Sequence, residues 1–513
     1  MTIMSLPVSL GGGTSPDAPV TRRVMARDRA ITVGRMLLSL VRPDIVGIHI
    51  EHTSRAVAKV ANGRLRSTDD GDRVNISFES VLGSGIKFSV DTNQLDEATL
   101  SHIVTQVESM SPKLAVDEIV TVEPNDMENF TYNAREHQPV ALWHESTARG
   151  METARGDAIP KIIDRIKSAG LSGAATVGLS ERAVLHLYRY GLVAFGEETD
   201  SEVTVTARTP SNTGSGWAGQ GARDWNAIDP LAVTDRAIAI AKQSDRPVAL
   251  EPGRRTAILG PAAVAQLVRR TIRYFDQETA YRHGPTWSPF TNLTTKRGER
   301  QTLLGQRVFD HRLMFIADPT DPLGGFPPFY ESNGLELWGV RGYPNPAMTF
   351  IERGVLAHFA NKVGNAVANE VTPCDIPRSV RVATAPGEAT ATIDEMIANC
   401  KDGVYVNRFS DIDFLDDSME AQNSGMMTGV TRDGCFSIRN GKIEKPIKNF
   451  RFMESPFYAF NRIEMIGTPE RVAFGYNSRP TEYEDFIRWP RFPIIVPPMM
   501  IRDFNFVALA DAV

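Results

Sequence analysis

The sequence predicts an α+β protein, with an N-terminal antiparallel sheet that carries helices on one face and a C-terminal β-rich domain that forms a barrel or sandwich. Two observations lead to this prediction. Strand-like alternation and then helical spacing fill the N-terminal half, and short strands with frequent turns fill the C-terminal half. We expect a flexible tail over residues 1–27, an α+β domain over 28–250 and a β-rich domain over 251–513.

The first sheet is predicted from residues 31–92, where apolar and polar residues alternate. Turn signals at Asn62-Gly63 and at Asp70-Gly71 divide this stretch into an antiparallel meander. Residues 95–110 then show the spacing of a helix that covers one face of the sheet, with apolar positions at Leu100, Ile103, Val104 and Val107.

A second helix and further strands complete the predicted N-terminal domain. Residues 157–169 carry an apolar stripe of isoleucines, and Gly170 ends the helix. Residues 172–208 divide into four short strands at glycines or short polar breaks. Asp229 and Pro230 predict a helix start, because Asp caps the free N–H groups and Pro suits the first turn.

The predicted C-terminal domain opens with a strand at 255–259 and a helix at 261–276. Many short strands follow, which favours a barrel or sandwich. Turn signals at Asp433-Gly434 and Asn440-Gly441 flank the segment CFSIR, so we expect it to form one strand of a hairpin.

The composition excludes several classes of function. At 513 residues, with 42% hydrophobic and 23% charged residues, the chain is typical of globular proteins. Its net charge of −6 argues against nucleic acid as a partner, because that affinity depends on clustered Lys and Arg. No apolar run approaches the roughly 18 residues that cross a membrane, and the first residues lack the charge order of a secretory signal. Three cysteines without CxxC spacing favour a reducing compartment, so we expect a cytoplasmic protein.

Several blocks carry a family resemblance when taken in their order along the chain. They are ANGRLRS, LDEATLSHIVTQVES, GSGWAGQG, the strand and helix at 255–276, GERQTLLGQRVFD, FIERGVLAHFANK, KDGVYVNRF and the stretch at 424–450. In this the chain resembles the TldD/PmbA family. Members of the TldD branch carry HExxxH on the helix after the strand at 255–259, together with a cysteine near the C-terminus, and act as zinc peptidases. The PmbA branch, also called TldE, lacks both features.

The resemblance places the HExxxH positions on a run of arginines. They fall on residues 269–274, which include Arg269, Arg270, Arg273 and Tyr274. A guanidinium has no lone pair to donate and would repel a divalent cation. The segment after 463–467, where the family carries its cysteine, contains none. The resemblance therefore implies the PmbA/TldE-like branch, with no zinc held by this chain.

Two interpretations of the arginine helix stay open. Arg269, Arg270 and Arg273 either form a solvated stripe opposite an apolar face, or they line a cleft and bind a carboxylate of a peptide or partner. In the second case Arg269, Arg273 and Trp217 are the candidate contacts. Trp217 lies among the glycines of GSGWAGQG, which we interpret as loop glycines because they lack the context of a nucleotide loop.

Other candidate sites are weaker. His49 and His52 are three residues apart, so on a strand they point to opposite faces and do not form a metal pair. His144-Glu145 lacks the second histidine of HExxH and is expected in a surface loop. Cys435 is interpreted as a small packing residue. No spacing supports a site built from His283, His311, Glu331 and Cys435.

The resemblance implies the function. We expect a subunit without catalytic residues or a cofactor of its own, paired with a zinc-carrying TldD-like subunit in a complex that processes small or unfolded peptides, in some settings during maturation of a natural product. One alternative is a homodimeric peptide-binding or scaffold protein without peptidase activity. A further alternative is an autonomous hydrolase with a site that uses no zinc.

Overall fold

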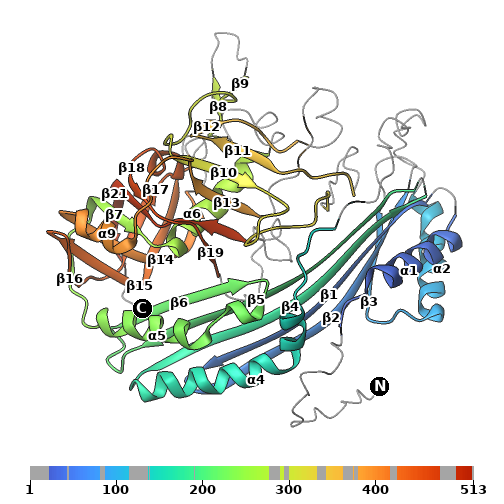
Figure 1. Cartoon of the computed structure of the whole chain (residues 1–513), viewed down its shortest axis with the longest axis horizontal. Coiled ribbons are helices and arrows are strands. Elements are labelled where there is room, and N and C mark those ends of the chain that lie inside the picture. The colour runs from blue at the N-terminus through green and yellow to red at the C-terminus, as the bar shows by residue number, and fades with distance from the viewer. Residues whose placement is uncertain are drawn as a thin grey trace.

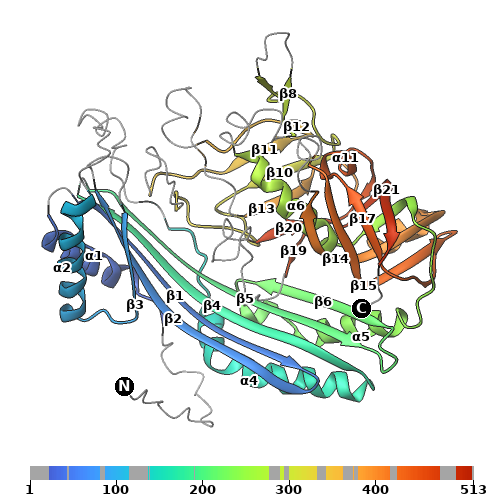
Figure 2. The same cartoon turned by 180° about the vertical axis from the view of Figure 1, so that it is seen from behind.

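The computed structural model describes residues 22–42, 45–80, 87–114, 137, 139–189, 191–276, 289–293, 300–331, 342–361, 372, 374, 379–415, 425–473 and 493–510. Their arrangement confirms the α+β class (Figure 1). A long sheet forms one layer, helices cover one of its faces, and the C-terminal half packs over the other face at one end (Figures 1 and 2). None of the described helices is long and apolar enough to cross a membrane.

The first sheet is antiparallel and has the strand order β3-β2-β1-β4-β5-β6. The predicted meander and the turn at Asn62-Gly63 are confirmed, since β1 and β2 pair from Ala61↔Arg64 onward. The strands are β1 (Ile45–Ala61), β2 (Arg64–Ser80), β3 (Lys87–Thr92), β4 (Ser172–Tyr188), β5 (Val193–Arg208) and β6 (Ser215–Ala222).

Three predictions inside this sheet are wrong. Asp70-Gly71 is not a turn but lies within β2, and GSGWAGQG is strand β6 rather than a loop. The four strands expected over 172–208 are two long ones, because the polar pairs Glu181-Arg182 and Thr199-Asp200 continue their strands.

Four main helices cover the same face of this sheet, as predicted. They are α1 (Arg27–Leu40), α2 (Glu97–Leu114), α4 (Glu145–Ser168) and α5 (Pro230–Gln243), with a 3-10 turn η1 (Trp225–Ala227) before α5. The predicted apolar positions of α2 are buried against strands β1 and β2. Asp229 caps α5 by accepting from the N–H groups of Leu231 and Ala232.

Two helix predictions need correction. Residues 31–40 form most of α1 rather than a strand, because Ile31, Val33 and Leu37 bury one side of a helix on the sheet. Helix α4 begins at Glu145 and not at 157, so Glu145 belongs to the helix rather than to a surface loop. Residues 1–21 of the expected tail lie outside the described residues.

The C-terminal half contains a closed barrel, as predicted. Strands β14, β7, β21, β17 and β15 pair in that order, and β14 pairs with β15 to close the ring. Their bounds are β7 (Gly253–Leu259), β14 (Asp402–Phe414), β15 (Met427–Arg439), β17 (Phe450–Glu454) and β21 (Met499–Leu509). Strands β16 (Lys442–Pro446) and β18 (Ile463–Ile466) pair with β15 and β21.

The hairpin around CFSIR is predicted correctly at only one end. Asn440-Gly441 is the two-residue turn between β15 and β16, and both residues have positive φ. Asp433 and Gly434 lie instead inside β15, at an irregularity in its pairing with β14. Their positive φ values mark a bulge, which directs the Asp433 side chain toward the first sheet.

A second C-terminal sheet packs beside the barrel and has the strand order β12-β11-β10-β13-β20-β19. These strands are β10 (Leu313–Ala317), β11 (Met348–Glu352), β12 (Val355–Leu356), β13 (Val380–Thr384), β19 (Glu470–Val472) and β20 (Ile494–Val496). The remaining elements are α6 (Pro261–Thr271), η2 (Ile272–Phe275), α9 (Ile393–Asn399), α11 (Pro456–Ala459) and the pair β8 (Thr291–Leu293) and β9 (Arg300–Thr302).

Candidate functional site

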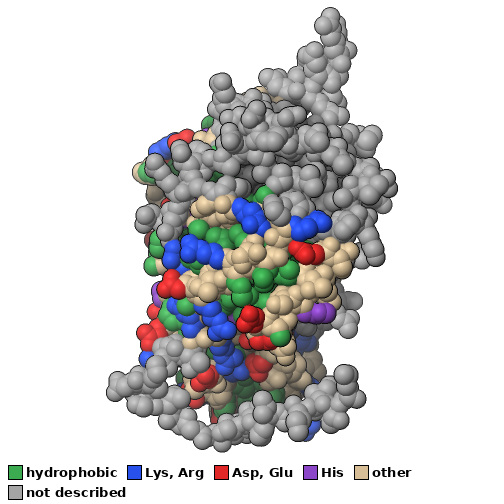
Figure 3. All heavy atoms as spheres, turned by 90° about the vertical axis from the view of Figure 1, so that its right-hand side faces the viewer, with side chains coloured by type: hydrophobic (Ala, Val, Ile, Leu, Met, Phe, Trp, Pro, Cys, Tyr) green, Lys and Arg blue, Asp and Glu red, His purple; other side chains and the backbone are tan. Residues whose placement is uncertain are grey.

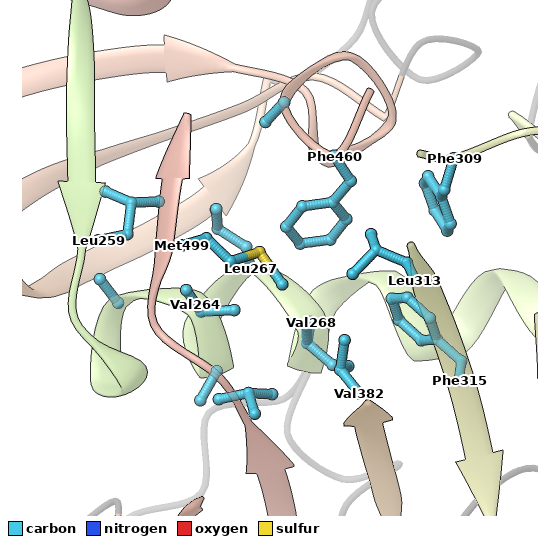
Figure 4. Packing of buried hydrophobic residues seen from close by; sticks show 14 of the residues in the cluster. Leu259, Val264, Leu267, Val268, Phe309, Leu313, Phe315, Val382, Phe460 and Met499 are labelled. Carbon is cyan, nitrogen blue, oxygen red and sulfur yellow. The ribbon is translucent and has the colours of Figure 1, made fainter. Parts of the chain in front are cut away.

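Helix α6 and the turn η2 occupy the predicted span 261–276. The helix lies between the barrel and the second C-terminal sheet, and its apolar side chains are fully buried in the core shared by both. Figure 4 shows Val264, Leu267 and Val268 among Leu259 and Met499 of the barrel and Phe315 and Val382 of the sheet. The apolar face predicted for this helix is therefore confirmed, although Ile272 is only partly buried.

The arginines on the opposite side of α6 are not fully exposed to solvent, as a solvated stripe would require. Arg269 and Arg270 are both half-buried, and Arg270 Nη2 donates to the Ile412 carbonyl oxygen at 2.8 Å. Tyr274 is 3% exposed, with its ring edge-on to Phe414 and Phe457. The side chain of Arg273 lies outside the described residues. Part of this face thus packs against β14 instead of facing water.

These side chains do not provide a zinc site. Catalytic zinc needs three protein ligands among His, Cys and carboxylates. Arginine supplies only donors, and Tyr274 is held in an aromatic cluster. Throughout the described part of the chain, no group of three or more His, Cys, Asp and Glu side chains is arranged to hold a metal ion.

Trp217 lies in β6, where the first sheet meets the barrel. Its carbonyl oxygen accepts from Asn407 Nδ2 at 2.9 Å, and the Arg408 guanidinium lies 5.3 Å from the centre of its ring. Arg408 also pairs with Asp433 in the bulge of β15, which accepts a hydrogen bond from Ser215. Trp217 is half-buried and packs at this junction.

A buried ion network joins the first sheet to the C-terminal half next to this junction. The Arg182 side chain is 6% exposed and pairs with Glu51 at 2.8 Å, with Glu198 at 3.0 Å and with Glu331. Arg223 donates to Glu198 at 3.0 Å and also to the Gly325 carbonyl oxygen. The network thus ties β1, β4 and β5 to residues 325–331.

A further contact extends this network along β5. Arg471 of β19 pairs with Asp200 and donates to the Leu323 carbonyl oxygen at 3.1 Å. Burial raises the pKa of Asp200, although Arg471 and Arg223 oppose that shift. Arg381 binds Asp321 through two nitrogens, so the loop that contains residues 321–331 is held from both sides.

Buried polar groups also line the helix-covered face of the same strands. Residues 22–25 cross that face in the gap between α1 and α4. The N–H of Arg23 donates to Glu181 at 3.4 Å, the N–H of Met25 donates to His52 Nδ1 at 3.1 Å, and Arg22 pairs with Glu197. The middle of the first sheet is therefore polar on both faces.

The weaker candidates are scattered. His49 and His52 do lie on opposite faces: His49 contacts His186 and Glu79, and His52 contacts Asp72. Cys435 is buried, and burial raises the pKa of its thiol to about 12. His311 is exposed beside Asp310 and Glu388, Glu331 pairs with Arg182, and His283 lies outside the described residues.

The buried network was not predicted from the sequence. Glu181-Arg182 and Thr199-Asp200 interrupt apolar strand patterns, which we interpreted as breaks between strands. The missed signal was the placement of these pairs within two segments that otherwise have strong strand character. A charge in such a position is compatible with a strand if a partner neutralises it, and sequence spacing cannot show that Glu331 does so.

Comparisons with known proteins agree with this architecture. Residues 252–508 match the model of the PmbA/TldA metallopeptidase C-terminal domain. Among curated proteins no relative matches the chain.

Several solved structures share the fold. A candidate modulator of a DNA gyrase from Thermotoga maritima is similar with a TM-score of 0.67 and 15% identity, over 93% of this chain and 100% of that one. TldE from Thermococcus kodakarensis gives 0.66 and 15%, over 93% and 99%. A candidate modulator of DNA gyrase from Bacteroides thetaiotaomicron gives 0.65 and 14%, over 94% and 100%.

Proposed function

Because the chain belongs to the PmbA/TldD metallopeptidase family, we propose that it is a TldE-like subunit that holds no zinc and pairs with a TldD-like subunit that does. The complex acts in the cytoplasm on small or unfolded peptides. The observation that supports this is the content of α6 and η2, where arginines and the buried Tyr274 stand at the positions to which the family resemblance assigns the zinc motif. The fold likeness to TldE over 93% of the chain agrees with this branch.

The role of this chain in the complex is to shape the peptide chamber. The apolar face of α6 is buried between the barrel and the second sheet, so the helix can form one wall of that chamber. Arg269 is the side chain we assign to peptide contact, because a guanidinium binds a carboxylate well. Arg270 donates to the backbone of β14 and holds the helix in place.

Metal content and native mass test the pairing. The purified chain is expected to contain far less than one zinc per molecule and to hydrolyse no peptide. After co-expression with a TldD-like protein, the two chains are expected to elute together from gel filtration with zinc and peptidase activity. Chelator-sensitive hydrolysis by the isolated chain would contradict the proposal and favour an autonomous hydrolase. A chain that binds peptide but never retains the second subunit would favour a scaffold protein.

Arg269→Ala tests the peptide contact within the active complex. The KM for a peptide with a free C-terminal carboxylate is expected to rise about tenfold or more, because a hydrogen bond to a charged group contributes about 1.5–3 kcal/mol. The KM for the same peptide with an amidated C-terminus should change little. Zinc content should stay at the wild-type level, and an equal loss with both peptides would remove the assigned contact.

A further inference from the structure

Residues 22–25, which precede α1, form a strap across the helix-covered face of the first sheet. Arg22 pairs with Glu197 of β5, and the N–H of Met25 donates to His52 of β1. Strand β4 lies between these two strands, so the strap runs across the sheet and not along a strand. Its polar contacts are therefore made to side chains, and their strength depends on the chemistry of those side chains.

Two backbone N–H groups of the strap donate to side chains that can titrate. The N–H of Met25 donates to His52 Nδ1 at 3.1 Å, and that of Arg23 donates to a carboxylate oxygen of Glu181 at 3.4 Å. Both acceptors are buried, since His52 is 7% exposed and Glu181 is fully buried. A backbone N–H can only donate, so each contact requires an acceptor atom on the side chain.

The strap fixes the protonation state of His52. Because Nδ1 accepts from the Met25 N–H, it carries a lone pair, and the single ring proton of the neutral imidazole lies on Nε2. Nε2 lies 2.7 Å from Asp72 Oδ1, which accepts that proton. A second proton would bind at Nδ1, where it would point at the N–H of Met25. Binding of the strap and protonation of His52 therefore exclude each other.

The other charged groups around His52 come from the neighbouring strands and from α4. Asp72 of β2 contacts its Nε2, and Glu181 of β4 lies diagonally across the strand pair on the same face. Both carboxylates favour a cationic imidazole. Arg155 of α4 is paired with Asp70 of β2. The strap is thus the contact that opposes a charged His52.

Positive charge is concentrated in the strap and in the helix that follows it. Arg22 and Arg23 lie in the strap, and Figure 3 shows Lys and Arg side chains on the α1 side of this end of the molecule, where Arg29 and Arg35 are exposed. Burial raises the pKa of Glu181, and the charges of the strap oppose that shift. Acid therefore removes an anion that attracts the strap and adds a cation that repels it.

We propose that residues 22–25 are an acid-released strap, which binds across the first sheet at neutral pH and detaches when His52 takes up a proton. Release uncovers Glu197 and the Trp143 ring, which together hold the Arg22 guanidinium. The proposal rests on the first sheet alone and is independent of zinc and of any pairing with a TldD-like subunit.

Hydrogen exchange of the strap amides in the full chain tests the proposal. An imidazole takes up its second proton between about pH 8 and about pH 5. Over this range the protection of residues 22–26, corrected for the intrinsic rate of exchange, is expected to fall about tenfold or more, the effect of one lost hydrogen bond. The amide of Leu37 in α1 should keep its protection. An equal loss at Leu37 would indicate general unfolding and would overturn the proposal.

His52→Asn separates protonation from packing. Asparagine Oδ1 can accept from the Met25 N–H at every pH, so protection of the strap should no longer depend on pH. The matched control is His102→Asn, which changes an exposed histidine of α2 and should keep the wild-type pH dependence.

Glu197→Gln tests the same strap without altering His52. It weakens the contact with Arg22, so protection should be lower at both ends of the pH range and should still fall on acidification. Wild-type protection that does not change with pH, or a His52→Asn variant that loses protection on acidification as wild type does, would each overturn the proposal.

Discussion

At the residue scale, the buried charges of the first sheet differ in how well they are compensated. Arg182 is surrounded by three carboxylates. Glu181, its neighbour in sequence, points to the other face and is fully buried. Burial raises the pKa of Glu181, and the long hydrogen bond from the Arg23 N–H and the charge of Arg22 offset only part of that shift. The folded protein therefore binds a proton at this side chain at higher pH than the unfolded chain does.

This pKa shift predicts how stability depends on pH. A carboxyl group whose pKa is raised by folding contributes stability below its unfolded pKa and loses it as pH rises through the folded pKa. Glu181→Gln should therefore raise the free energy of unfolding at pH 8 by an amount on the order of 1–3 kcal/mol, the usual cost of an incompletely satisfied buried polar group. Its melting temperature at pH 8 should be higher than that of wild type. The two proteins should converge near pH 4. Glu152→Gln, which changes an exposed residue of α4, should have no such effect.

At the element scale, the glycines of β6 explain how α5 packs. A Cβ atom on Gly216 would lie 2.3 Å from the Ala237 carbonyl oxygen and 2.3 Å from the Ala241 nitrogen. The helix backbone therefore rests directly on the strand. Trp217 projects to the opposite face and meets Arg408 of the barrel. Alternating small and large residues thus let one strand bind a helix on one side and the barrel on the other.

Gly216→Ala is expected to separate α5 from β6. Neither backbone group can move without shifting the helix, so we expect a loss of about 2–3 kcal/mol in the free energy of unfolding, typical of overpacking. Chemical denaturation measures it. Gly156→Ala is the matched control, because nothing lies within 4 Å of the added Cβ and alanine favours the helix; it should stabilise by up to about 1 kcal/mol. Equal effects of the two substitutions would contradict the packing argument.

At the scale of the whole molecule, the network around Arg182 fixes the C-terminal half over the first sheet. Glu331 belongs to a loop that Arg223, Arg381 and Arg471 also bind. Arg182, Glu198 and Glu331 are buried, so water does not compete for their ion pairs and the side chains keep one arrangement. The position of α6 relative to the sheet depends on this loop as well as on the apolar core.

Removing Arg182 should loosen this arrangement. Arg182→Met leaves three carboxylates without their shared cation, and breaking a buried ion pair costs about 3–5 kcal/mol. We expect a lower melting temperature at pH 8 and a smaller deficit near pH 4, where the carboxylates take up protons. Arg73→Met breaks an exposed pair with Asp91 and should cost less than about 1 kcal/mol. A loss that did not depend on pH would show that packing, and not charge, is what Arg182 provides.

Local patterns were sufficient to predict much of the fold. The helix at 261–276, the cap at Asp229, the apolar face of α2 and the Asn62-Gly63 turn are encoded within short windows, where capping, periodicity and backbone freedom act directly. The arginines in the last turn of α6 can also be read within a short window of sequence, and the proposed function starts from them.

Long-range contacts decided the rest. Arg182 in β4 and Asp433 in β15 lie at places where the sequence predicts a break or a turn, yet both belong to continuous strands because distant groups bind their side chains. The free energy of a buried charge depends on whether a counter-charge is present, and a residue more than a hundred positions away supplies it here. The sequence alone determined the elements whose signals are local, and the tertiary structure decided which charged segments could continue as buried strands, because only folding brings their counter-charges into contact.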